Sequence, residues 1–113
     1  MKLAIIGSRS FNNYDLLKST LNDNFNNITC IISGGAKGAD SLAEKYAFEN
    51  NIATIIFKPD WKKYGRGAGI IRNKDIISNS DAAIAFWDGE SKGTLNSINL
   101  CEKEQTPITV VKY

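Results

Sequence analysis

Two glycine-rich segments of the chain have the composition of loops that bring backbone N–H groups against an anion. The first is ISGGAKGAD, residues 32–40, and the second is WDGESKGTLNS, residues 87–97. Each continues an apolar run and precedes a helical pattern, where free N–H groups and the helix dipole favour a phosphate. One such segment is as typical of a tight structural turn, but two at one sheet edge favour a nucleotide-type site. The candidate ligand-binding residues in these segments are Gly34, Gly35, Gly38, Gly89, Gly93 and Thr94.

Two arginines carry positive charge that a phosphate would need. Arg9 follows the first apolar run of the chain and either clamps a phosphate or lies on the surface; we favour the clamp. Arg72 lies in the first turn of a predicted helix, where the helix dipole disfavours a cation unless an anion compensates it. We therefore count Arg72 and the adjacent Asn73 among the ligand-binding residues.

Each acidic or aromatic side chain near these segments has two possible interpretations. Asp40 begins a predicted helix, so it is either an N-terminal cap or an acceptor for a ribose hydroxyl. Asp60 and Trp61 lie in a segment rich in glycine, and Trp87 ends an apolar run. A tryptophan at the rim of a site stacks on a base, but in a small domain it more often belongs to the core. Asp88 is either a turn residue or a ligand contact.

The composition excludes several kinds of chemistry. The chain has 113 residues and no histidine, which excludes a histidine general base, a Ser-His-Asp triad and a histidine-bound zinc. Cys30 and Cys101 lie in apolar patterns and are expected in the core. The acids show no clustered ligand pattern, so we expect no metal and no cofactor. The net charge of +2 is spread along the chain, which does not favour a nucleic acid as partner.

Apolar runs alternate with helical patterns along the whole chain. The expected strands cover residues 2–7, 28–33, 52–57, 82–87 and 108–111. Residues 58–69 contain Pro59 and three glycines, and we expect no regular element there. No apolar run is long enough for a signal peptide or a membrane span, so we expect a cytoplasmic protein. The expected helices cover residues 14–25, about 70–80 and 94–104, the last burying Leu95, Ile98 and Cys101. A further helix is expected to start near Asp40 and to end at Asn50-Asn51.

This alternation predicts one α/β domain, residues 1–113, with a three-layer Rossmann-like fold. Five strands buried on both faces form a mainly parallel sheet, and right-handed crossovers give the order 3-2-1-4-5. The ligand then belongs at the carboxyl ends of strands one, two and four. These ends carry Gly7-Ser8-Arg9, Ser33-Gly34-Gly35 and Trp87-Asp88-Gly89.

Four segments together resemble a known family: IIGSRSF, SGGAKGADSLAEKYA, KPDWKKYGRGAGIIRNKDI and SDAAIAFWDGESKGT. They are similar to the YspA-type branch of the SLOG superfamily, which is related to the DprA/Smf and LOG (Lonely Guy) proteins. The resemblance covers nearly the whole chain. It implies a Rossmann-like fold that binds a nucleotide or a nucleotide-derived ligand.

The LOG enzymes, which cleave the base from a nucleoside monophosphate, resemble the chain less closely. Their phosphate-binding motif PGGxGTxxE aligns with Trp87 to Ser97 when a short insertion is allowed. The resemblance places their catalytic arginine on Arg72, but their catalytic glutamate falls on Ser97, which has no carboxylate. An N-glycosidase is therefore the alternative function, with Arg72 and an acid such as Asp40 or Asp60 as catalytic residues.

The favoured interpretation is a protein that senses or sequesters a nucleotide-type small molecule and forms a homo-oligomer. Single-stranded DNA binding, the third reading, requires a basic groove with stacking aromatic side chains. Lys58, Lys62, Lys63 and Arg66 surround Trp61 in the sequence, and we interpret them as a solvated loop.

Overall fold

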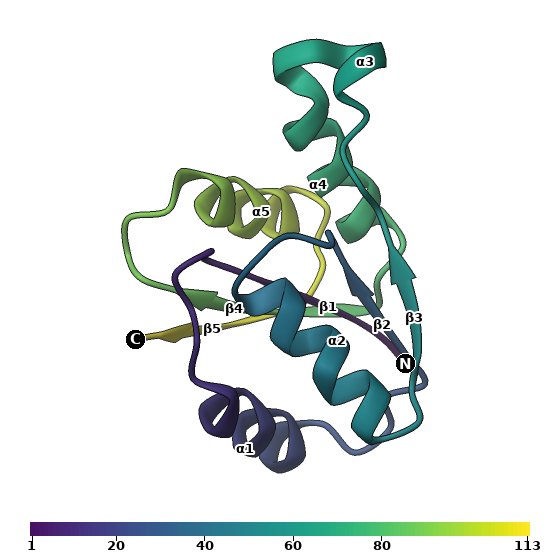
Figure 1. The fold of residues 1–113 in the computed structure, drawn as a ribbon, viewed down its shortest axis with the longest axis vertical. Coiled ribbons are helices and arrows are strands. Elements are labelled where there is room, and N and C mark those ends of the chain that lie inside the picture. The colour runs from purple at the N-terminus through teal and green to yellow at the C-terminus, as the bar shows by residue number, and fades with distance from the viewer.

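The computed structural model describes all residues from Met1 to Tyr113 and contains one five-stranded sheet (Figure 1). The strand order is β3-β2-β1-β4-β5 and every neighbouring pair is parallel, which confirms the predicted Rossmann-like topology. Leu3 pairs with Ile31 on one side and with Ala82 on the other, so β1 lies at the centre. The strands are β1 (Lys2–Gly7), β2 (Cys30–Ser33), β3 (Ala53–Ile56), β4 (Ala82–Trp87) and β5 (Ile108–Lys112).

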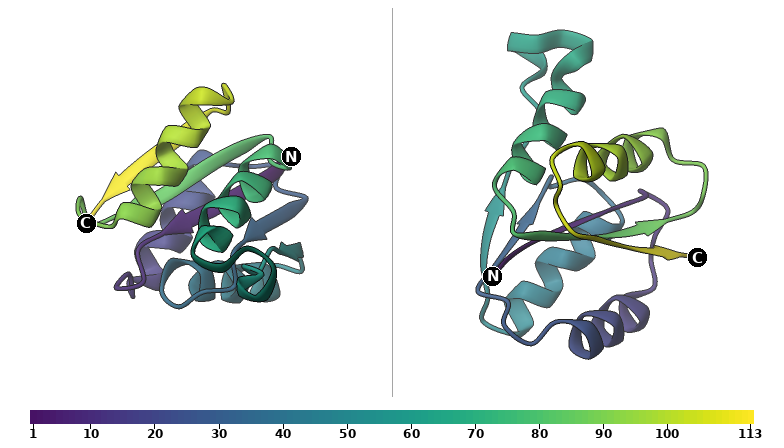
Figure 2. Two further views of the ribbon diagram at one scale, coloured as in Figure 1. Left: turned by 90° about the horizontal axis from the view of Figure 1, so that it is seen from above. Right: turned by 180° about the vertical axis from the view of Figure 1, so that it is seen from behind.

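Four longer helices cover the two faces of the sheet and complete the three layers. One face packs against α1 (Tyr14–Asn24) and α2 (Ala39–Glu49), and the other against α4 (Ala68–Ser78) and α5 (Lys92–Lys103). Figure 2 shows these two helix pairs from above and from behind. Right-handed crossovers produce this arrangement, because each parallel connection must return over one face of the sheet.

The alternation of side chains along the central strands divides the core into two clusters. Leu3 and Ile5 of β1 point to the α1 and α2 side, whereas Ala4 and Ile6 point to the α4 and α5 side. The middle strands are buried on both faces, as expected. The edge strands differ: three of the four residues of β3, which has a neighbouring strand on one side only, are exposed.

Polar side chains cap two of the four longer helices, α1 and α5. Asn13 accepts a hydrogen bond from the Leu16 N–H at 3.0 Å and so caps α1. Ser91 caps α5 by accepting from the Thr94 N–H at 3.4 Å. Helix α5 thus begins at Lys92, two residues before the predicted start at Thr94. Leu95, predicted to be buried, is 40% exposed, and Thr94 and Ser97 take the buried positions instead.

The expectation of an irregular segment at residues 58–69 is wrong. Two short helices form there, α3 (Trp61–Tyr64) and the 3-10 helix η1 (Gly65–Gly67), and α4 begins at Ala68. Asp60 accepts a hydrogen bond from the Lys63 N–H at 3.1 Å and caps α3, so Pro59 precedes the helix and does not interrupt it. In Figure 1 this segment projects beyond the body of the domain along its longest direction.

None of the helices has both the length and the apolar character needed to cross a membrane.

Candidate functional site

Two adjoining cavities lie where the loops after β1, β2 and β4 meet. The polar pocket has a volume of about 460 Å³, and the basic groove has a volume of about 670 Å³. The polar pocket is lined by Ile6, Gly7, Ser8, Arg9, Ser10, Ala36, Asp40, Arg72, Asn73, Ile76, Asp88, Ser91, Gly93, Thr94 and Ser97. The basic groove is lined by Arg9, Gly34, Gly35, Ala36, Lys58, Pro59, Trp61, Arg66, Gly69, Ile70, Arg72, Asn73, Lys92, Gly93 and Asn96. The five residues shared by both cavities are Arg9, Ala36, Arg72, Asn73 and Gly93.

The basic groove combines positive charge with an exposed aromatic ring. Its lining contains no aspartate or glutamate. Trp61 of α3 is 57% exposed, and its ring lies beside Gly69 at the start of α4. A groove of this composition suits an anion that also carries flat rings. Five cationic side chains line it, namely Arg9, Lys58, Arg66, Arg72 and Lys92.

Arg72 is held at the junction of the two cavities by neutral partners. Its Nη1 atom donates to the carbonyl oxygen of Gly34 at 2.9 Å, and its Nε atom donates to the Asn73 side chain at 3.0 Å. The Asn73 amide in turn donates to Asn96 of α5 at 3.2 Å. Burial lowers the pKa of Arg72, Asp40 opposes this by attraction, and Arg9 adds to it by repulsion. A bound anion would relieve both unfavourable effects on the charged guanidinium.

Asp40 is a buried acid in the wall of the polar pocket. It is 8% exposed and accepts a hydrogen bond through Oδ2 from the Ala36 N–H at 3.1 Å. Burial raises the pKa of Asp40, although the Ala36 N–H, the charge of Arg72 and the nearby Ser33 hydroxyl act in the opposite direction. The Ser33 hydroxyl is itself buried and has no hydrogen-bond partner of normal geometry.

The glycines of the first glycine-rich segment lie against the protein's own atoms. A Cβ atom on Gly34 would lie 2.5 Å from Nη1 of Arg72 and 3.0 Å from Oδ2 of Asp40. Gly38 has a φ of 78°, and a Cβ atom there would lie 2.5 Å from the backbone oxygen of Arg9. These absent side chains allow the loops after β1 and β2 to touch each other and allow Arg72 to enter between them.

The second glycine-rich segment is open. No atom lies within 4 Å of a Cβ atom placed on Gly89 or Gly93. Asp88 organises the turn, because its Oδ1 atom accepts from the N–H groups of Glu90 at 2.9 Å and Ser91 at 2.8 Å. These N–H groups, that of Ser91 first, lower the pKa of Asp88. The start of α5 at Gly93 therefore faces free space in both cavities.

The structure brings most of the predicted site residues to the two cavities. Of the three residues considered for catalysis, Asp40 and Arg72 line the polar pocket and Asp60 lines neither cavity. The predicted ligand residues that line the polar pocket are Gly7, Ser8, Arg9, Asp40, Arg72, Asn73, Asp88, Gly93 and Thr94. Those that line only the basic groove are Gly34, Gly35 and Trp61.

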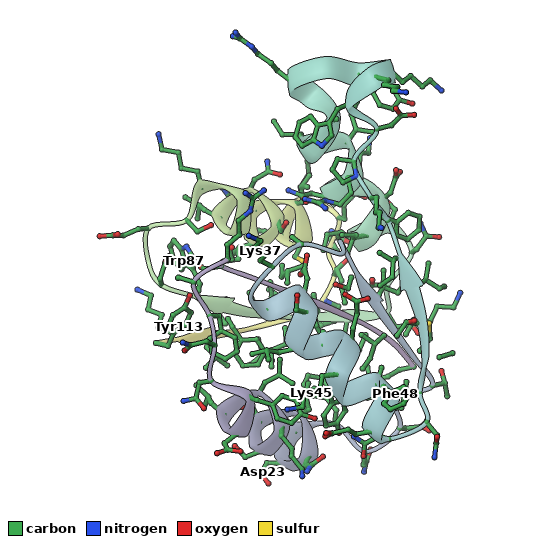
Figure 3. The ribbon with its side chains drawn as sticks, viewed as in Figure 1. Asp23, Lys37, Lys45, Phe48, Trp87 and Tyr113 are labelled. Carbon is green, nitrogen blue, oxygen red and sulfur yellow. The ribbon has the colours of Figure 1, made fainter.

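Four predicted ligand residues line neither cavity: Ser33, Gly38, Trp87 and Gly89. Trp87 has a structural partner, since its Nε1 atom donates to the Ser91 carbonyl oxygen at 3.1 Å. Figure 3 shows Trp87 close to Tyr113, and the Tyr113 N–H donates to the Trp87 carbonyl oxygen at 3.3 Å. Trp87 thus lies at the ends of β4 and β5, whereas Trp61 lies on the projecting segment.

Sequence reasoning missed four contributors to the site. Lys92 is the first residue of α5, and Asn96 lies one helical turn later; both line the basic groove. Lys58 and Arg66 also line the groove, contrary to their interpretation as part of a solvated loop. The sequence Pro59-Asp60 could have indicated this. Aspartate is a typical N-cap residue, so Asp60 predicts a helix that starts directly after it.

Comparison with known proteins supports the fold and identifies relatives. Residues 1–64 match the model of a family described as the YspA, cpYpsA-related SLOG family. The Gene 61 protein of Mycobacterium phage D29 is 30% identical over 84 residues, which cover 69% of this chain and 67% of the phage protein.

Two solved structures of DNA processing protein A, a SLOG member, are similar across the chain. The protein from Helicobacter pylori, for which a single-stranded DNA binding mode is described, aligns with a TM-score of 0.74 and 26% identity. DprA from Streptococcus pneumoniae aligns with a TM-score of 0.80 and 20% identity, which supports the fold alone. The alignments cover 100% and 99% of this chain but only 66% and 50% of the two DprA chains.

The expectation of a small-molecule partner, with nucleic acid not favoured, is wrong. The likeness to the H. pylori protein points to a nucleic acid as partner instead. The physical reason is that charges scattered in the sequence are gathered by the fold: Arg9 follows β1, Lys58 follows β3 and Lys92 begins α5, and all three line one groove. The even distribution of charge along the sequence therefore did not predict the positive charge of this surface.

Proposed function

The chain belongs to the YspA, cpYpsA-related SLOG family, and we propose that it binds single-stranded nucleic acid in the basic groove. The observation that carries this proposal is the lining of the groove, which has five cations, no acid and one exposed tryptophan. Cationic side chains attract the phosphates of a strand, and an aromatic ring stacks on its bases.

The exposed ring of Trp61 favours a single strand over a duplex. Bases in a duplex are already stacked on one another, so a side chain reaches their faces only where the strand is unpaired. Trp61 belongs to α3, in the segment that projects in Figure 1, and it lines the groove together with Lys92 and Asn96 of α5. The likeness to the H. pylori protein, which binds single-stranded DNA, agrees with this geometry.

One nucleotide unit of the strand is proposed to enter the polar pocket. The pocket offers hydroxyl donors from Ser8 and Thr94 and the guanidinium groups of Arg9 and Arg72. Gly93 adds the open start of α5, where backbone N–H groups favour a phosphate. The two arginines border both cavities, so adjacent phosphates of one strand could contact the same pair of side chains.

Binding is measured by the fluorescence anisotropy of a labelled single strand of about 12 nucleotides, a length typical of such sites. We expect Arg66→Ala to weaken binding and to lower the slope of log affinity against log salt by about 0.7, the value for one lost phosphate contact. The matched control is Lys18→Ala, which removes the same charge from an exposed position on α1 and lines neither cavity. Equal effects of the two substitutions would contradict binding in the groove.

Stacking is tested separately with Trp61. We expect Trp61→Ala to weaken binding about 10-fold, since stacking of one base contributes about 1–3 kcal/mol. Trp61→Phe keeps an aromatic face and should restore part of the affinity. A duplex of the same sequence serves as competitor, and tighter binding of the duplex than of the single strand would overturn the proposal.

A further inference from the structure

Asp40 is an unusual residue for a pocket that binds phosphates. Its side chain is more than nine-tenths buried, and it lines the polar pocket beside Arg72. A buried carboxylate repels phosphates, so its presence calls for a ligand group that donates a hydrogen bond.

Asp40 also retains unused capacity to accept hydrogen bonds. The Ala36 N–H donates to Oδ2, while Oδ1 accepts no hydrogen bond from the protein. A carboxylate accepts about four hydrogen bonds, so acceptor sites remain free even when the nearby Ser33 hydroxyl is counted as a second donor. The other acid of the pocket, Asp88, differs because its Oδ1 atom is already used by the N–H groups of Glu90 and Ser91.

A nucleotide has few donors besides its base. Both sugar oxygens of an internal DNA nucleotide are esterified, so this unit has no hydroxyl group to offer. A ribonucleotide has a 2′-hydroxyl, and the last nucleotide of a strand has a free 3′-hydroxyl. Since Trp61 in the adjacent groove provides the stacking surface for bases, the sugar is the part of the nucleotide left for Asp40.

We infer that Asp40 accepts a hydrogen bond from a sugar hydroxyl and so selects nucleotides that carry one. This inference rests on the proposed function and adds a specificity to it. An internal DNA nucleotide in the polar pocket would leave Oδ1 of the buried carboxylate without a donor. A ribonucleotide or a 3′-terminal nucleotide would supply the donor, and the two sources are distinguished by experiment.

The test compares strands that differ in one kind of hydroxyl only. Labelled oligo(U) and oligo(dU) share the base and differ in the 2′-hydroxyl. Oligo(dU) ending in a 3′-hydroxyl and the same strand ending in a 3′-deoxynucleotide differ at the strand end. We expect the hydroxyl-bearing member of one pair to bind about 10-fold more tightly, the effect of one hydrogen bond to a charged acceptor.

Two variants test whether Asp40 causes the tighter binding of the strand that has the hydroxyl group. Asp40→Asn removes the charge and should reduce the preference to about 3-fold or less, because a neutral acceptor binds the hydroxyl more weakly. The matched control is Glu44→Gln, which makes the same charge change on an exposed position of α2 and lines neither cavity. It should leave the ratio of the two affinities unchanged. The ratio is the informative quantity, since a merely structural role of Asp40 would change both affinities alike.

Each remaining outcome has a definite meaning. Equal affinities within both pairs for the unmodified protein overturn the inference, whether or not Asp40→Asn folds, and leave the proposed function intact. A preference that persists unchanged in a folded Asp40→Asn variant also overturns it. Failure of every single strand to bind overturns the proposed function itself.

Discussion

The two glycine-rich segments have similar sequences but different roles in the structure. Around Gly34 and Gly38 the space of the missing side chains is filled by Arg72 and by the backbone of the loop after β1. Around Gly93 the same space is empty and borders both cavities. The first segment thus uses glycine to assemble the site, and the second leaves room beside a helix start. Glycine content alone therefore does not identify the loop that touches a ligand.

The largest expected difference between the segments is in stability. We expect Gly38→Ala to lower the free energy of unfolding by about 3 kcal/mol, because the positive φ is strained for alanine and the Cβ atom meets the backbone of Arg9. Gly93→Ala should leave it unchanged or raise it by about 0.5 kcal/mol, since alanine fits a helix better. Chemical denaturation measures both. Similar losses in the two variants would remove the distinction between the segments.

A smaller effect is expected at Gly34, and it concerns binding. The added methyl of Gly34→Ala would lie 2.5 Å from Nη1 of Arg72, so the guanidinium must move from the Gly34 carbonyl oxygen. We expect the affinity for a single strand to fall about 10-fold, or about 1.4 kcal/mol, with a modest loss of stability. Gly67→Ala, at a position with open space and outside both cavities, is the control. Undiminished affinity in Gly34→Ala would show that the position of Arg72 is unimportant.

The smallest effects concern the acids beside the two segments, and their signs are opposite. The pKa of Asp40 is raised by burial, so its ionised form costs stability, and Asp40→Asn should be more stable than the parent at neutral pH. The pKa of Asp88 is lowered by backbone N–H groups, so its ionised form contributes stability and Asp88→Asn should be less stable. The difference for Asp40 should fade as the pH falls through its raised pKa towards the ordinary aspartate value of about 3.9, whereas the difference for Asp88 should fade only below that value. Thermal unfolding from neutral to acid pH measures them, and shifts of the same sign would contradict this account.

Much of the candidate site followed from the position of residues at strand ends. Ser8, Arg9, Gly93 and Thr94 lie at the polar pocket because the carboxyl ends of β1 and β4 are adjacent in a parallel sheet. The same rule also named Trp87 and Gly89, which line neither cavity. A strand end gives the edge of the sheet, but not the direction of each side chain in a loop.

The structure of the projecting segment, residues 58–69, was not predicted correctly from the local sequence. Pro59 and the glycines suggested an irregular loop, yet Asp60 caps α3, Gly65 and Gly67 begin and end η1, and Gly69 lies in the first turn of α4. The sequence 58–66 therefore forms one wall of the basic groove and carries Lys58, Trp61 and Arg66 to it. The positions of proline and glycine relative to a helix end decide their effect, and their number does not.

The sequence by itself determined the layers of the fold, the parallel sheet and its order. Alternating apolar strands and amphipathic helices can bury their apolar faces in few ways, and the crossover rule leaves one simple order. Only the tertiary structure decided which glycines face a cavity and which cations share one. Those properties depend on distances between segments far apart in the chain, as between Gly34 and Arg72, and a local pattern contains no such distance.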